Sequence, residues 1–87
     1  MQRKLDTSRV DELIDLMGIP LKEAKKQFEE QLGQMETWQI LKVLTDNQRM
    51  VDHITEYVDV QGYNCIVTDY GRGRWAIYVQ LTEVDLF

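Results

Sequence analysis

Cysteine, proline and glycine are scarce in this 87-residue chain, which holds one, one and five of them respectively. The single cysteine, Cys65, cannot form an internal disulfide. Together with the single histidine, His53, it makes too small a ligand set for a structural zinc site. No stretch rich in glycine or proline is long enough for an interdomain linker, so we expect one domain over residues 1–87.

Long apolar runs and positive charge are also in short supply. No run approaches the roughly 18 apolar residues of a membrane span, and the charged start lacks the apolar segment of a secretory signal. We therefore expect a cytoplasmic protein with no membrane partner. Ten basic against fifteen acidic side chains leave a net charge of −5, which opposes binding to the nucleic-acid backbone. We do not expect a nucleic-acid partner.

What the chain does have is enough apolar surface to fold, because 44% of its residues are apolar. Near its start, residues 2–6 suggest a short strand on the strength of Leu5 alone. From Ser8 to Gly18 the apolar residues recur at helical spacing, which favours a short helix. A strand over residues 12–17 is the competing interpretation, because so short a window does not separate a period of 2 from one of 3.6. The residues that carry the helical spacing are Val10, Leu13, Ile14 and Met17.

The middle of the chain is clearer. One helix should run from Pro20 to Gly33, because Pro suits a first helical turn and apolar residues mark one face of the segment. Residues 38–45 are apolar on both sides, which predicts a central strand. A second helix should follow Asp46 or Asn47 and end before Gly62. The two helical stripes are Leu21, Ala24, Phe28 and Leu32, then Met50, Val51, Ile54, Tyr57 and Val58.

The end of the chain suggests two paired strands. Residues 63–70 and 74–81 both favour strands, and the sequence Tyr-Gly-Arg-Gly-Arg between them is typical of a hairpin. The order is then β-α-β-α-β-β, with an extra short helix near the front. We predict an α+β fold: a two-layer α/β sandwich in which a four-stranded mixed sheet carries two main helices on one face. Its other face should be partly open to water or to a partner.

Several strings, in this order, resemble the TusA-like (SirA-like) family of small sulfur-carrier proteins. They are Leu5-Asp6, Pro20-Leu21-Lys22-Glu23-Ala24-Lys25-Lys26, Leu41-Lys42-Val43-Leu44-Thr45-Asp46 and Gly62-Tyr63. They span most of the chain. The resemblance implies a fold of the kind just predicted and a sulfur-accepting cysteine in a Cys-Pro-x-Pro motif at the start of the first helix.

The chain departs from that motif where the chemistry would occur. Counting back from Pro20, the family's second proline, Gly18 stands at the first proline and Met17 at the cysteine. Sulfur relay requires an activated thiolate, which methionine cannot provide. We therefore expect a non-catalytic domain, with no catalytic residue, cofactor or metal, that acts by contact with a protein partner or a second copy. The expected contact residues are Met17, Gly18, Pro20 and Lys22 at the helix start and Arg72 and Arg74 in the hairpin.

Two other functions stay open at this point. One is a divergent sulfur carrier that uses Cys65, although a cysteine within a strand is more often buried. The other is an RNA-binding α/β module, since the hairpin arginines lie beside Tyr70. We expect His53 to be an ordinary surface histidine, and Asp11, Glu12 and Asp15 to belong to a solvated helix face.

Overall fold

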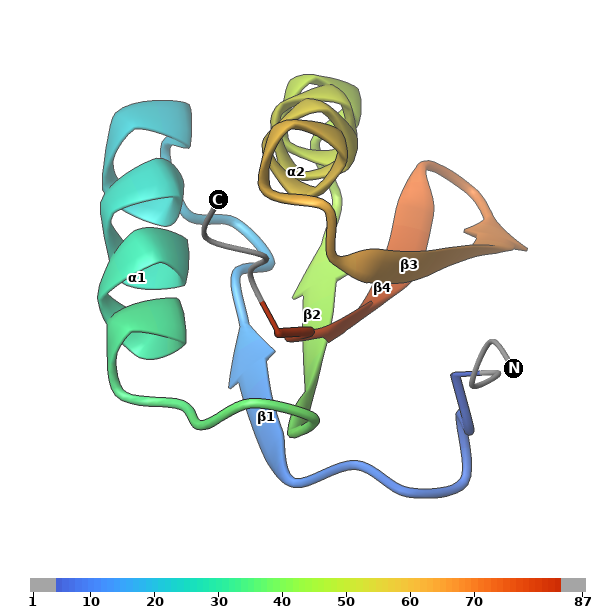
Figure 1. The fold of residues 1–87 in the computed structure, drawn as a ribbon. Helices are drawn as coiled ribbons and strands as arrows, with labels where there is room; N and C mark the ends of the chain where they lie inside the picture. The colour runs from blue at the N-terminus through green and yellow to red at the C-terminus, as the bar shows by residue number, and fades with distance from the viewer. Residues whose placement is uncertain (1–4, 84–87) are drawn as a thin grey trace.

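The computed structural model describes residues 5–83, and within them the chain forms two helices and one four-stranded sheet (Figure 1). The strands lie in the order β1-β2-β4-β3. Strand β1 is parallel to β2, and β4 is antiparallel to both β2 and β3. This confirms the predicted mixed sheet and order of elements. The elements are β1 (Glu12–Asp15), α1 (Leu21–Gly33), β2 (Ile40–Thr45), α2 (Gln48–Gln61), β3 (Asn64–Gly71) and β4 (Arg74–Gln80).

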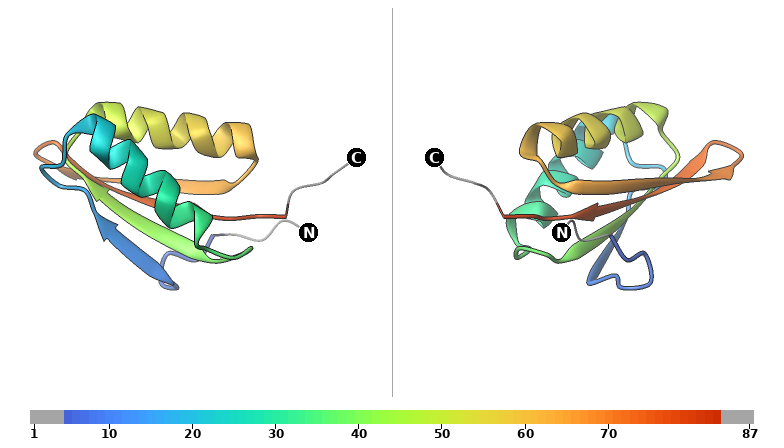
Figure 2. Two further views of the ribbon diagram at one scale, coloured as in Figure 1. Left: turned by 90° about the vertical axis from the view of Figure 1, so that its left-hand side faces the viewer. Right: turned by 45° about the vertical axis from the view of Figure 1, so that its right-hand side comes forward.

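Both helices lie on the same face of the sheet, as Figure 2 shows. The main core fills the space between the two layers, because each helix turns its apolar stripe toward the sheet. Phe28 of α1 and Ile54 of α2 are completely buried there. The strand side chains that meet them are Leu41 and Val43 of β2 and Ile77 and Val79 of β4, with Leu16 and Leu81 at the margins.

Local signals account for the limits of both helices. Pro20 precedes α1 with φ −56°, a value suited to a helix start. At the start of α2, the Asn47 side-chain oxygen accepts a hydrogen bond from the Arg49 N–H at 2.9 Å. Gly62 ends α2 in the left-handed region, with φ +76°. A residue with a Cβ would be strained at this position, so the predicted stop at Gly62 has a clear physical cause.

The opposite face of the sheet carries a second, smaller apolar cluster. Ile40 of β2 and Ala76 and Tyr78 of β4 are buried there, and Leu5 and Leu44 pack against them. Residues 5–11 run along this side of the sheet (Figure 2). The face predicted to be partly open is therefore covered in part by Leu5.

The predicted short helix over residues 8–17 is wrong. The segment instead contains strand β1, whose Ile14 lies beside Val43 of β2. Hydrogen bonds from the Asp11 N–H to the Ile40 carbonyl (3.0 Å) and from the Leu16 N–H to the Leu44 carbonyl (2.8 Å) extend this parallel pairing. Pairing with a neighbouring strand therefore outweighed the helical spacing, as tertiary context commonly does over a short window.

Other boundaries need smaller corrections. Leu5 and Asp6 lie outside any strand, and residues 2–4 of that predicted strand lie outside the described residues. Strand β2 begins at Ile40 rather than residue 38, because Trp38 has a positive φ of 73° that interrupts extended backbone. Strand β3 covers residues 64–71 and β4 covers 74–80, each within a residue of the predicted limits.

Candidate docking site

The loop between β1 and α1 holds the position at which the family resemblance places a cysteine. Leu16 is buried and anchors the loop to the core. The Met17 N–H donates to the Asp15 carboxylate at 2.9 Å. The Gly18 N–H donates to both oxygens of Asp46, each at 3.2 Å, and its φ of +73° explains the glycine. The loop is thus tied to the ends of both β1 and β2.

The β3–β4 hairpin turns tightly at Arg72 and Gly73. Gly71 pairs with Arg74 across the turn, and the two central residues have φ values of 59° and 69°. Two positive φ angles at these positions are typical of a type I′ turn, which matches the twist of the flanking strands. The hairpin prediction is confirmed, and the side chains of Arg72 and Arg74 are exposed.

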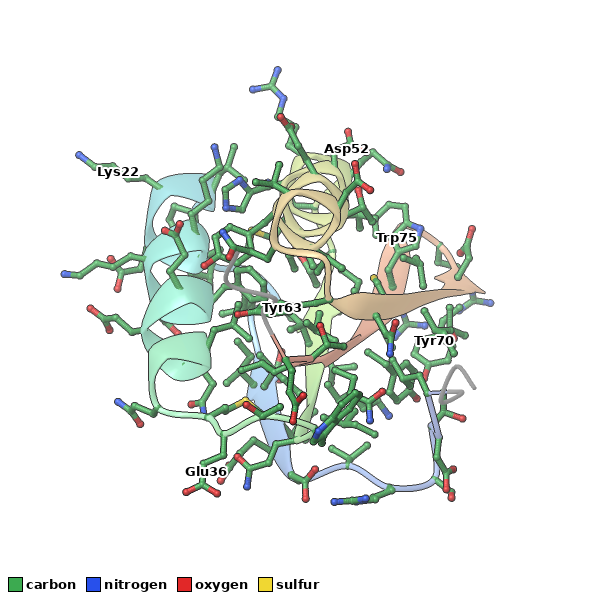
Figure 3. The ribbon with its side chains drawn as sticks, in the orientation of Figure 1. Lys22, Glu36, Asp52, Tyr63, Tyr70 and Trp75 are labelled. Atoms are coloured by element: carbon green, nitrogen blue, oxygen red, sulfur yellow. The ribbon has the colours of Figure 1, made fainter. Side chains whose placement is uncertain are left out.

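The loop and the hairpin meet around a hollow of about 280 Å³. Its lining comes from Met17 in the loop, Leu44 of β2, Tyr70 of β3, and Arg74 and Trp75 of β4. Figure 3 shows Tyr70 and Trp75 at the β3–β4 end of the molecule. Sites that bind small groups commonly combine such an apolar lining with a few polar groups. The hollow brings together Met17 and Arg74, which are far apart in the sequence.

The other predicted contact residues do not line this hollow. Gly18 and Pro20 shape the loop and the helix start. Lys22 is exposed on α1, and Figure 3 shows it at the side of the molecule away from Tyr70 and Trp75. Arg72 lies in the turn next to the hollow. Thus two of the six predicted residues line one hollow, and the other four lie beside it or elsewhere.

Sequence reasoning missed three lining residues: Leu44, Tyr70 and Trp75. Their positions are decided by strand pairing, because Thr45 lies opposite Trp75 and Leu44 opposite Ala76. The strand pattern was visible in the sequence, but this register was not. The available signal was the position of Tyr70 beside Arg72 and Arg74 in the sequence, which the sequence analysis connected only with RNA binding.

Around the hollow, the carboxylates have hydrogen-bond partners, whereas the arginines have no ion-pair partners in the described part of the chain. Three nearby carboxylates accept hydrogen bonds from backbone N–H groups: Asp15 at the end of β1 from Met17, Asp46 just after β2 from Gly18, and Asp69 in β3 from Gly71 at 2.7 Å. By contrast, neither Arg72 nor Arg74 forms an ion pair with any of residues 5–83. The guanidinium of Arg74 is therefore available to a carboxylate from outside.

Cys65, the only thiol, lies away from the hollow on β3. It is half-buried, pairs with Val79 of β4 and packs against the main core beneath the helices. Burial raises the pKa of the Cys65 thiol to about 11. At neutral pH the reactive thiolate is thus strongly disfavoured, in contrast to the lowered pKa of catalytic cysteines.

The expectation that His53 is an ordinary surface residue is wrong. Its ring packs beside Phe28 and Tyr57, with centroid distances of 6.3 and 6.4 Å, and these two rings also contact each other, with centroids 5.6 Å apart. The Nε2 atom is buried and has no hydrogen-bond partner among residues 5–83. The helical spacing predicted that this side chain points away from the buried side, but the approach of α1 leaves it half-buried. Burial raises the pKa of the neighbouring Tyr57 hydroxyl.

Two further features of residues 5–83 bear on the function. No three His, Cys, Asp or Glu side chains in this part of the chain come together in a way that would hold a metal ion. Neither described helix combines the length and the apolar character needed to cross a lipid bilayer.

Comparison with known proteins supports the fold. No protein-family model matches the chain, and no curated protein matches it significantly. Among solved structures, a SirA-like protein from Desulfitobacterium hafniense is similar, with a TM-score of 0.60 and 24% identity. The match covers 83% of this chain and 99% of that one. The chain has a SirA-like fold. At this level of identity the similarity concerns the fold alone.

Proposed function

We propose that this chain is a non-catalytic SirA-like domain that binds a protein partner through the hollow beside Met17. The observation that carries this proposal is the thioether of Met17, which lines an apolar hollow at the position where the resemblance places the sulfur-accepting cysteine. A thioether has no S–H to lose, so it cannot form the thiolate that relay requires. A contact function needs only the surface.

The chemistry of the hollow indicates the kind of segment that fits. Leu44, Tyr70 and Trp75 offer an apolar and aromatic lining, which suits one aromatic or aliphatic side chain. Arg74 has no ion-pair partner among residues 5–83, so it favours a carboxylate next to that side chain. The proposed ligand is therefore an acidic peptide segment of a partner protein that carries one apolar side chain.

A peptide titration followed by NMR tests this proposal. The probe is acetyl-Gly-Glu-Phe-Glu-Gly-amide, and the controls replace both Glu residues with Gln or with Lys. We expect the acidic peptide to shift the signals of the Trp75 indole N–H and of the Arg74 backbone more than either control does. Equal shifts with all three peptides would refute a charge-selective site.

Two matched variants localise the effect. Arg74→Gln removes the exposed cation at the hollow, whereas Arg49→Gln removes an exposed cation on α2. We expect a several-fold weakening of peptide binding in the first variant and little change in the second, since an ion pair at an exposed position contributes up to about 1 kcal/mol. Equal losses in the two variants would indicate attraction by overall charge only.

A second candidate function is sulfur carriage by Cys65, the one thiol in the chain. The test measures the rate of alkylation of Cys65 at pH 8. The reference is a double variant, Cys65→Ala with Ile66→Cys, whose single thiol lies on the opposite, exposed side of β3. With a pKa of about 11, Cys65 should react roughly a hundredfold more slowly than an ordinary exposed thiol. Equal rates, or a persulfide on Cys65 after incubation with a cysteine desulfurase and cysteine, would favour the carrier function.

A further inference from the structure

The two edges of the sheet are built differently. The β1 edge is four residues long and carries two acidic side chains, Glu12 and Asp15. Short length and charge are the usual protection of an edge strand against pairing with another chain. The β3 edge has eight residues without lysine, arginine or proline. Ile66 and Val67 are about 40% exposed on its two opposite faces, at 38% and 41%.

Hydrogen bonds elsewhere in the sheet establish which backbone groups of β3 point outward. Just past the end of β4, the Leu81 N–H donates to the Gln39 carbonyl and the Leu81 carbonyl accepts from the Trp38 N–H. Odd-numbered residues of β4 therefore direct their backbone groups toward β2, and even-numbered ones toward β3. The even-numbered residues are paired as Gln80 with Asn64, Tyr78 with Ile66 and Ala76 with Thr68.

It follows that Cys65, Val67 and Asp69 direct their N–H and C=O groups away from β4. No other strand formed by residues 5–83 lies beyond β3. The outer edge thus presents a row of unpaired donors and acceptors that is centred on Val67. Such a row is a template for a further strand.

We propose that β3 pairs antiparallel with β3 of a second copy of this chain, about a two-fold axis at Val67. In this register Val67 lies opposite itself, and Cys65 lies opposite Asp69 in both directions. Each of these pairs exchanges two backbone hydrogen bonds, so every outward-directed group of the three residues is used. The helices of both copies then lie on the same face of one continuous sheet.

The side chains are compatible with this pairing. Ile66 would lie opposite Thr68 on the face away from the helices, and Val67 opposite Val67 on the other face. Asp69 is the only acidic side chain of β3, and the two copies of it would be about 13 Å apart, four strand positions along. A two-fold axis at Ile66 would leave the Asp69 backbone groups opposite Tyr63, whose N–H already donates to the Val58 carbonyl. The axis at Val67 is therefore favoured.

Net charge opposes this association, because each copy carries −5. Repulsion between exposed charges is screened by salt. We therefore expect the dimer to tighten as the salt concentration rises. Binding of an acidic peptide in the hollow should weaken instead, so the two surfaces have opposite salt dependences. This inference does not rest on the proposed function, and Arg74→Gln should leave the dimer intact.

Sedimentation equilibrium of the full chain, over a range of protein concentrations, tests the pairing. We expect the wild-type mass to double. Val67→Lys should give a monomer, because it places like charges opposite each other at the two-fold axis. Val60→Lys makes the same substitution at an exposed position on α2 and should remain dimeric. A monomeric wild-type protein at every concentration, or a dimeric, folded Val67→Lys variant, would overturn the proposal.

Cross-linking tests the register. In a Cys65→Ser background, Val67→Cys should form a covalent dimer rapidly under a mild oxidant, because the two thiols face each other. Tyr70→Cys, three positions from the axis on the same strand, should not. Equal cross-linking of the two variants, or none in either while the protein is a dimer, would rule out the register and the edge.

Discussion

The two faces of the sheet differ in what covers them. On the face beneath the helices, Leu41, Val43, Ile77 and Val79 are completely buried by two amphipathic helices. On the other face, the buried cluster is restricted to a few side chains around Tyr78, and partners for it come from Leu5 and Leu44. The stability of the fold should therefore reside mainly in the helix-covered face.

The face away from the helices also carries polar and charged side chains. On the open face, the Asn64 side-chain amide donates to Gln80 Oε1 at 3.1 Å, and Gln80 Nε2 donates to the Trp38 carbonyl at 3.3 Å. Lys42 lies with its Nζ 5.4 Å from the centre of the Tyr78 ring, and its interaction with the Tyr78 side chain raises the pKa of Lys42. The open face thus tolerates polar and charged groups because they find partners there.

A matched pair of substitutions gives the largest expected effect. Ile77→Ala truncates a buried strand residue under the helices, and Ile40→Ala truncates one on the open face. We expect losses in the free energy of unfolding of about 4 and about 2 kcal/mol, because the smaller cluster can relax around its cavity. Chemical denaturation measures both. Equal losses would mean that the open face is packed as firmly as the core.

A smaller loss of stability is expected from a substitution of Leu5, which packs on the open face. Leu5→Ala removes part of a half-buried side chain that packs against the Tyr78 cluster. We expect a loss of about 1 kcal/mol in the free energy of unfolding, together with faster hydrogen exchange in residues 5–11. Arg9→Ala, at an exposed position in the same segment, serves as the control and should change stability little. No difference between the two variants would show that the segment does not seal the open face.

A substitution of His53 tests whether its buried Nε2 atom destabilises the helix-covered side. His53→Leu removes a buried Nε2 atom that has no partner among residues 5–83 and substitutes a good helix former. We expect stability to rise by about 1 kcal/mol, measured by denaturation, because an unsatisfied buried polar atom costs about 1–3 kcal/mol. His53→Gln keeps a polar group and should not reproduce the gain. A loss in the leucine variant would indicate that the ring contacts with Phe28 and Tyr57 contribute more.

The last prediction concerns the stability of the fold at alkaline pH. Burial raises the pKa of Cys65 from 9.0 to about 11, so between these values the unfolded chain loses the thiol proton first. The folded state then binds more protons, and the free energy of unfolding must fall as the pH rises through this range. Cys65→Ala should remove part of this fall in denaturation curves at pH 8 and pH 10. An unchanged slope would mean that the thiol is not held in its neutral form by folding.

The elements that could be predicted are those with a long, consistent pattern. The stripe from Leu21 to Leu32 spans three turns and has a single interpretation, and Gly62 marks the end of α2 because only glycine adopts its φ without strain. Strand β1 could not be assigned securely, because four residues fit two periods and only pairing with β2 separates them. His53 was misjudged for a similar reason, since it is α1 that covers it.

The candidate site divides in the same way. The resemblance of the sequence strings places Met17 at the cysteine position, and the sequence around Gly71 and Gly73 predicts that Arg74 follows a tight turn, because both inferences use only residue identity and short spacing. That these two residues share one hollow with Trp75, and that the backbone of Val67 points to a free edge, depends on strand order and register. Register is a long-range property, because a shift in strand pairing would place the same residues opposite different neighbours. Local spacing along the chain therefore cannot predict it.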